Sequence, residues 1–187
     1  LELQNNINDN NRLELMMQIN KLNKQYVNIT SDDHKDVKEL MNYLGITVIT
    51  SPTEAETTCA MLQKGGIVEY TFSDDTDLFA YGCENVLKTN KNNSFKLVKL
   101  NEILQGFQLT FPEFIDLCIL CGCDYCPSIP RVNNHKAFEL ISKYKTIENV
   151  LKHLRENNHK IPDHFSYNNA RKLFNDNHNY ANKVLNV

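Results

Sequence analysis

The chain has 187 residues, which is enough to bury a hydrophobic core and form one domain or a domain and a half. Its net charge is −3, and no apolar run approaches the length of about 18 residues that a transmembrane helix needs. No charged segment followed by an apolar one opens the chain, so a secretory signal is not expected. The first residue is Leu rather than Met, which suggests a fragment.

The first part of the chain predicts two helices. Residues 1–30 are polar, with one apolar helix face formed by Leu13, Met16, Met17, Ile19 and Leu22. Residues 31–44 are amphipathic, with Ser31 as the expected cap and Gly45 as the stop. We expect the second helix to bury a stripe made of Val37, Leu40, Met41 and Leu44.

The next part alternates between strand and helix signals. Residues 46–50 and 67–72 predict buried strands, and a helix begins at Pro52-Thr53 and runs to Lys64 before Gly65-Gly66. The segment DTDLFAYG starts another helix, and NVLKTN with SFKLVKL predicts a hairpin at 91–93. This alternation indicates an α/β fold with a mostly parallel central sheet flanked by helices.

From Thr110 onward the chain is predicted to be helical. A core helix starts near Pro112 and ends at Gly122, two short helices cover 135–144 and 146–155, and another lies near 166–174. Charge divides in the same region: residues 1–129 have 10 basic and 18 acidic residues (−8), and residues 130–187 have 10 and 5 (+5). A basic half beside an acidic one is typical of phosphate binding beside metal binding.

Five acidic residues stand where predicted strands or helices end: Glu54, Glu56, Asp75, Asp77 and Asp124. Two of the clusters follow successive strands, so we expect them at one rim of the sheet. Converging carboxylates need a compensating cation, and their hard oxygens suit Mg²⁺ or Mn²⁺. Alternatively, each acid is a solvated loop residue or a helix cap, and Asp74 is read as such a neighbour.

Six cysteines are present, and four of them have the spacing Cys118-x-x-Cys121-x-Cys123-x-x-Cys126. This spacing resembles that of zinc ligands, but apolar neighbours equally fit a buried helix end where cysteine acts as a small hydrophobe. Free thiols indicate a reducing compartment, the nucleus or cytosol.

Four segments taken together resemble the flap endonuclease family of structure-specific 5′ nucleases: PTEAETTCAML, SDDTDLFAYG, FIDLCILCGCDYCPSI and KAFELISKYKTIENVL. The resemblance runs from about Ser31 to Asp176 and covers that family's internal region and helix-three-turn-helix segment. It implies a PIN-like α/β core over 31–109 and a helical DNA-binding segment over 110–187. Residues 1–30 would be a remnant of the family's helical arch.

The resemblance also assigns roles to residues. Five of the family's seven catalytic, metal-binding carboxylates match Glu54, Glu56, Asp75, Asp77 and Asp124, with two divalent ions in a complete site and no zinc. The DNA-binding hairpin, where the family also binds a monovalent cation, would use Ser128, Arg131, Asn133, His135 and Lys136. Arg131 and Asn133 replace the usual glycines, and Asn133 is the residue we expect to tolerate a positive φ.

The resulting hypothesis is a Mg²⁺-dependent nuclease acting on 5′-flap DNA in DNA repair and replication, with no membrane association. A sliding-clamp contact of the full protein is left open, since no segment for it is visible in this sequence. This chain by itself is expected to be weak or inactive, because two family acids are not in it. Two rivals are a catalytically silent DNA-binding module with a relic metal site and a PIN-like RNase.

Overall fold

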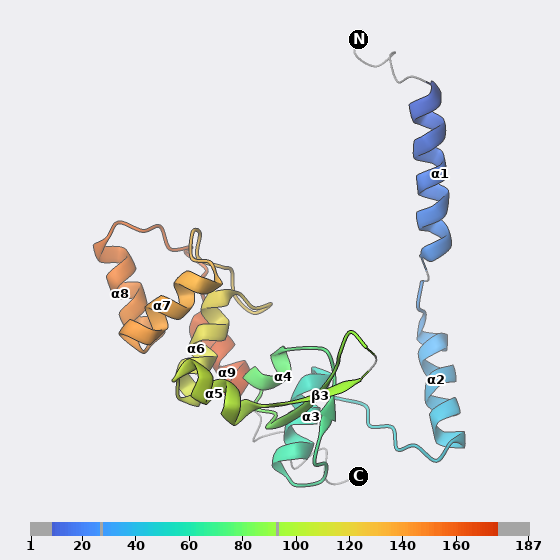
Figure 1. The fold of residues 1–187 in the computed structure, drawn as a ribbon, viewed down its shortest axis with the longest axis horizontal. Coiled ribbons are helices and arrows are strands. Elements are labelled where there is room, and N and C mark those ends of the chain that lie inside the picture. Colours follow the sequence, from blue (N-terminus) through green and yellow to red (C-terminus); the bar gives the residue numbers. More distant parts are fainter. Residues whose placement is uncertain (1–8, 27, 93, 176–187) are drawn as a thin grey trace. The chain divides into compact units, whose positions relative to one another are not determined.

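The structure, a computed structural model, describes residues 9–26, 28–92 and 94–175 (Figure 1). The chain divides into two units, Leu1–Ile49 and Thr50–Val187. The first unit contains the helices α1 (Asp9–Gln25) and α2 (Ser31–Tyr43), as the sequence predicts. Residue 30, rather than Ser31, caps α2: the Thr30 hydroxyl accepts from the Asp33 N–H, and the Asp33 carboxylate accepts from the Thr30 N–H at 2.7 Å.

Two predictions for the first unit are wrong. The stripe expected to be buried on α2 is mostly exposed: Val37, Leu40 and Leu44 are all more than half accessible, and Met41 is half-buried. Residues 46–50 form no strand, because a strand needs a hydrogen-bonded neighbour and no described residue pairs with this segment.

The second unit begins with the α/β part, and the expected fold class is confirmed. It consists of α3 (Ala55–Lys64), β1 (Thr71–Phe72), α4 (Asp77–Ala80), β2 (Asn85–Thr89), β3 (Phe95–Lys99) and α5 (Leu100–Phe107). The described sheet has the order β1-β2-β3, with β1 parallel to β2 and β2 antiparallel to β3. The predicted hairpin is therefore confirmed, and the sheet in this part of the chain is mixed.

Only the end of the predicted strand 67–72 pairs with β2, and the side chain of Gln63 explains why. This buried amide donates to the carbonyls of Glu69 at 3.0 Å and Asn85 at 2.8 Å. Its oxygen accepts from the backbone N–H of Asn85 at 3.1 Å. The backbone groups at the start of β2 are thus satisfied by a side chain from α3, and the regular ladder begins only at Thr71.

The rest of the second unit is helical: α6 (Phe111–Cys121), α7 (Asn134–Tyr144), α8 (Ile147–Glu156) and α9 (Tyr167–Asn175). A capping box of Thr110 and Glu113, with Pro112 in the first turn, fixes the start of α6. Helix α6 packs against α4, α7 and α9, so it links the sheet side to the helical side of one continuous hydrophobic core (Figure 1).

The sequence interpretation missed α5, although its signal was present. Leu100, Ile103, Leu104 and Phe107 have the i, i+3, i+4, i+7 spacing of an amphipathic helix, and α5 follows β3 without a loop. Within the described ranges, no single helix is long and apolar enough to cross a membrane. The bent pair α5 and α6 meets that criterion only when the two are taken together.

Candidate metal and nucleic-acid site

Glu54 and Glu56 lie at the irregular entrance of α3. Glu54 is the last residue before the helix, and its side chain does not cap the helix. The entrance is held instead by Ser51, whose hydroxyl donates to the Glu54 carbonyl at 2.8 Å and hydrogen-bonds to the Thr58 hydroxyl at 2.7 Å. The Glu54 carboxylate therefore makes no capping hydrogen bond at the start of α3.

The Asp74–Asp77 segment connects β1 to α4, and its three acids have different surroundings. The Asp74 carboxylate accepts from the Thr89 N–H at 2.9 Å, so Asp74 helps to hold the turn against β2. The Asp75 carboxylate accepts from the Asp77 N–H at 2.9 Å, which brings these two residues together at the start of α4. The structure thus gives Asp74 a structural contact that Asp75 and Asp77 do not share.

Asp124 follows the end of α6. The helix stops at Gly122, whose φ of +114° is strained for residues with a side chain. Asp124 and Tyr125 then form a tight turn between Cys123 and Cys126, which pair as an isolated antiparallel bridge. The exposed Asp124 is therefore held at the tip of a short, well-defined turn.

The charges of these segments act on one another. Partial desolvation at the start of α4 raises the pKa of Asp77, although the residue is exposed overall, and the negative charges of Asp75, Asp124 and Glu56 raise it further. The structure therefore brings carboxylates from three separate segments of the chain within electrostatic reach of each other. Among the described residues, none of the five predicted acids takes part in an ion pair.

The chemistry of this donor set fits a hard divalent cation, because carboxylate oxygens are its preferred ligands and a cation would offset their repulsion. In the part of the chain that the structure describes, no group of three or more His, Cys, Asp or Glu side chains is arranged to hold a metal ion. The metal-binding role of the five acids accordingly stays a prediction.

All five residues predicted to bind DNA are exposed, but the hairpin differs from its expected geometry. Arg131, not Asn133, has the positive φ, at +63°. Asn133 has an ordinary φ of −82° and caps α7, its side chain accepting from the Lys136 N–H at 2.9 Å. A side chain that can cap a helix is more useful in extended backbone than in the left-handed region, so the strain falls on Arg131.

Two side chains at the start of α7, Lys136 and His135, lie near the same acid, Glu139. Lys136 Nζ lies 3.1 Å from a Glu139 oxygen, and His135 Nδ1 lies 3.4 Å from the other. Exposed pairs of this kind are weak and are exchanged easily for other anions. Arg131 has no ion pair among the described residues, which leaves its charge available to an external anion.

Residues 45–124 match the family model of the XPG I-region. The flap endonuclease 1 of Drosophila grimshawi is 38% identical over 162 residues, which cover 84% of this chain and 42% of that protein. This chain belongs to the flap endonuclease family. It spans about two fifths of the length of such curated relatives.

Solved structures agree with this membership. The flap endonuclease-1 of Methanococcus jannaschii has a TM-score of 0.66 at 22% identity, covering 84% of this chain and 49% of that one, which shows the fold. The catalytic core of Rad2 in complex with DNA substrate has a TM-score of 0.65 at 26% identity, covering 80% and 50%.

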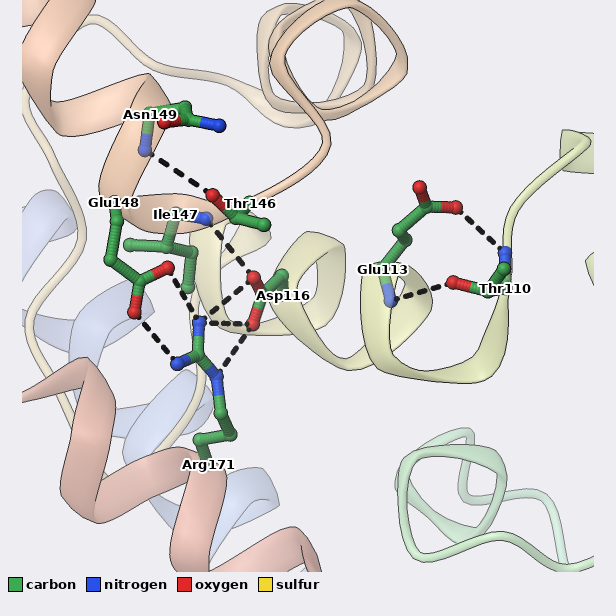
Figure 2. A network of polar contacts seen from close by, with 8 residues as sticks. All are labelled: Thr110, Glu113, Asp116, Thr146, Ile147, Glu148, Asn149 and Arg171. Carbon is green, nitrogen blue, oxygen red and sulfur yellow. Dashed lines mark hydrogen bonds and ion pairs between the residues drawn. The ribbon is translucent and has the colours of Figure 1, made fainter.

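A network that the sequence interpretation missed joins three helices of this family member (Figure 2). Asp116 of α6 is buried and accepts from the Arg171 guanidinium of α9 through two bonds of 2.9 Å. It also accepts from the Ile147 N–H at the start of α8, at 3.0 Å. Arg171 reaches outward to Glu148 at 2.8 Å, and this bond lowers the pKa of Glu148. The only sequence signal was an acid inside the apolar run of α6.

An aromatic cluster packs beneath the acid-bearing segments. Tyr81 ends α4, one turn after Asp77, and its hydroxyl is hydrogen-bonded to that of Tyr125, the residue after Asp124. The buried ring of Phe174 on α9 contacts both, with centroids 5.2 Å from Tyr81 and 5.6 Å from Tyr125. The last described helix thus supports the two segments that carry Asp77 and Asp124.

Proposed function

We propose that this chain is part of a divalent-metal-dependent, structure-specific nuclease that hydrolyses phosphodiester bonds in branched DNA near a 5′ flap. The observation that carries the proposal is that the negative charges of Glu56, Asp75 and Asp124, which come from three segments, all raise the pKa of Asp77. Such a grouping is costly unless a cation relieves it, and the chain belongs to a family named for flap cleavage.

In this proposal Asp75, Asp77 and Asp124, with Glu54 and Glu56, would hold Mg²⁺ or Mn²⁺, two ions in a complete site. A bound divalent ion activates water and stabilises the charge that develops on the leaving 3′ oxygen. The protein's own part is to hold the acids apart from any basic side chain and to keep their turns rigid. The Ser51 contacts, the Asp75–Asp77 bond and the aromatic cluster supply that rigidity.

The metal test is a calorimetric Mg²⁺ titration of the 187-residue chain and two variants. Asp75→Asn should remove or strongly weaken Mg²⁺ binding, because it deletes a charge from the cluster while keeping the side-chain shape. Asp74→Asn is the matched control: it changes the adjacent acid, whose oxygen bonds to the Thr89 N–H, and should leave binding intact. Equal losses in both variants would contradict the assignment of Asp75.

Duplex DNA would be bound by the basic helical half, through Arg131, His135 and Lys136 with Ser128 and Asn133, and with a monovalent cation at the same hairpin. Arg131→Glu combined with Lys136→Glu should weaken duplex binding and flatten its log–log salt dependence by about one unit for each phosphate that is no longer neutralised. Lys96→Glu, on β3, is the control with the same kind of charge change elsewhere. An unchanged salt slope in the double variant would mean that DNA does not use this hairpin.

A DNA-binding module without catalysis is the second candidate, because the described acids are not arranged to hold a metal ion. Metal-dependent assays on flap DNA, blunt duplex and single-stranded RNA separate it from the nuclease and from an RNase. For the chain on its own we expect weak flap cleavage at most, abolished by Asp75→Ala. DNA binding without any Mg²⁺ binding would favour the silent module.

A further inference from the structure

The turn that carries Asp124 is enclosed by two cysteines. Cys123 and Cys126 lie opposite each other in an antiparallel bridge, and the Cys126 N–H donates to the Cys123 carbonyl at 3.4 Å. Their sulfur atoms are already in contact, 3.9 Å apart, and both are free thiols. Asp124 and Tyr125 are the two residues between them.

This geometry suits a disulfide. Opposed residues of an antiparallel pair have Cα atoms about 4.5–5.5 Å apart, which lies inside the range of about 4.4–6.8 Å found for disulfides. The sulfur atoms need to approach from 3.9 Å to the S–S bond length of about 2.05 Å. Side-chain rotation can provide most of that movement, so the bridge need not be broken.

The other cysteines of the same motif are less suited to pairing. Cys118 and Cys121 lie three residues apart on α6, where the helical hydrogen bonds fix their backbone. Side chains at that spacing have Cβ atoms about 5–6 Å apart. A disulfide requires about 3.5–4.5 Å between its Cβ atoms, so bridging this pair would distort the helix.

We propose that Cys123 and Cys126 are a redox-modification site, at which a peroxide or a disulfide of low molecular weight joins the two thiols into a disulfide that encloses Asp124 and Tyr125. The pair has the Cys-x-x-Cys spacing common in dithiol redox motifs. The inference rests on the geometry of the turn and not on the proposed nuclease function.

Hydrogen peroxide can oxidise the two thiols in two steps. Cys123, the more accessible of the two, attacks a peroxide oxygen as thiolate, forming a sulfenic acid and releasing hydroxide, which takes up the thiol proton as water. The Cys126 sulfur then attacks the sulfenic sulfur, and the hydroxyl group leaves with the Cys126 proton as a second water. Two thiols are oxidised to one disulfide, and one peroxide is reduced to two waters.

Peptide mapping of the full chain tests the proposal directly. The tryptic peptide 100–131 contains all four cysteines of the motif, and cleavage before Asp116 and Asp124 leaves two cysteine-containing pieces: 116–123 with three cysteines, and 124–131 with Cys126. After treatment with hydrogen peroxide and blocking of the remaining thiols, a Cys123–Cys126 disulfide keeps the two pieces joined and lighter by two hydrogen atoms. Dithiothreitol should release them.

Two variants make the assignment specific. Cys123→Ser should abolish the joined species, and Cys121→Ser should leave its yield within about twofold of that of the unaltered chain, since Cys121 is on the helix. The proposal is overturned if oxidised wild-type chain releases the Cys126 piece freely, or if Cys121→Ser abolishes the joined species while Cys123→Ser retains it. Both readouts are covalent, so neither depends on cleavage of DNA.

The same oxidised sample also bears on the proposed function. If Asp124 is a metal ligand, closing the ring around it should change the Mg²⁺ affinity severalfold, and reduction should restore the original value. An unchanged affinity with the disulfide present would count against Asp124 as a ligand and would leave the modification site standing. The failure of one proposal is thus distinguishable from the failure of the other.

Discussion

Two groups of carboxylates in the second unit show opposite ways of placing negative charge in a fold. Asp116 is buried, yet it is fully partnered by Arg171 and by the Ile147 N–H (Figure 2). Asp75, Asp77 and Asp124 are exposed, and no described basic side chain pairs with them. The fold therefore supplies a counter-charge to the buried acid and, among the described residues, none to the acids that we propose bind a metal ion.

The largest change in stability is expected when the contact between Asp116 and Arg171 is removed. Arg171→Met should cost about 3 kcal/mol in the free energy of unfolding, because it leaves the buried Asp116 charge without its cation. Urea denaturation followed by circular dichroism measures this loss.

Glu148→Gln is the matched control, since it removes only the exposed acid that Arg171 contacts and should cost less than about 1 kcal/mol. Combining Arg171→Met with Asp116→Asn should recover most of the loss, because Asn keeps an acceptor for the Ile147 N–H. A loss below about 1 kcal/mol for Arg171→Met alone would mean that Asp116 does not depend on Arg171 as its counter-charge.

The acids without a basic partner, Asp75, Asp77 and Asp124, should instead make the stability of the chain depend on Mg²⁺. At a Mg²⁺ concentration about ten times its Kd, the wild-type chain should gain about 1.4 kcal/mol of stability. Asp124→Asn should lose this gain, and Arg171→Met should keep it relative to its own lower baseline. Thermal melting with Mg²⁺ or with EDTA measures both gains. Equal gains in all three proteins would mean that Asp124 does not contribute to Mg²⁺ binding.

A smaller effect is expected from relieving the repulsion itself. In EDTA, Asp77→Asn should stabilise the chain by a few tenths of a kcal/mol, because it removes the charge on which Asp75, Asp124 and Glu56 act unfavourably. Asp74→Asn, with its bond to Thr89, should not stabilise. A destabilised Asp77→Asn chain would show that this carboxylate is favourably placed even without metal.

The smallest expected difference is in how Asp77 and Glu148 make stability depend on pH. The pKa of Asp77 is raised above its ordinary 3.8, so its contribution to stability is present at low pH and is lost as the pH rises through the folded value. The pKa of Glu148 is lowered from 4.5, so its contribution is present above that value and is lost as the pH falls through the folded one.

Relative to wild type, Asp77→Asn should therefore become more favourable as the pH rises from about 4, and Glu148→Gln should become less unfavourable as the pH falls below about 4.5. Denaturation in EDTA across this range measures both slopes. Slopes of the same sign would contradict the opposite environments assigned to the two acids.

The sequence predicts most helices of the second unit, with α5 the exception, because their boundaries depend on local chemistry. Pro112, Gly65 and Gly122 start or stop helices regardless of what lies nearby. The strand at 46–50 failed for the converse reason: its apolar, β-branched residues favour a strand, but pairing depends on a neighbour that local sequence does not specify.

The candidate site also combines features that local sequence specifies with features that depend on distant residues. The acids could be named from their motifs, whereas the supports beneath them could not. Arg171 lies 55 residues from Asp116, and nothing in either local sequence selects the other. The hairpin prediction erred at Asn133 because its side chain competes for a second role, capping α7, which left Arg131 to adopt the left-handed backbone.

Helix α9 gives the chain an order of assembly. Synthesis runs from the amino end, so Glu54, Asp77 and Asp124 have all been made before Phe174 and Arg171 exist. The packing beneath the acids and the neutralisation of Asp116 both require α9, the last helix that the structure describes. A nascent chain that stops short of Tyr167 would contain all five acids but would lack the Phe174 ring that packs against Tyr81 and Tyr125 and the guanidinium that neutralises Asp116.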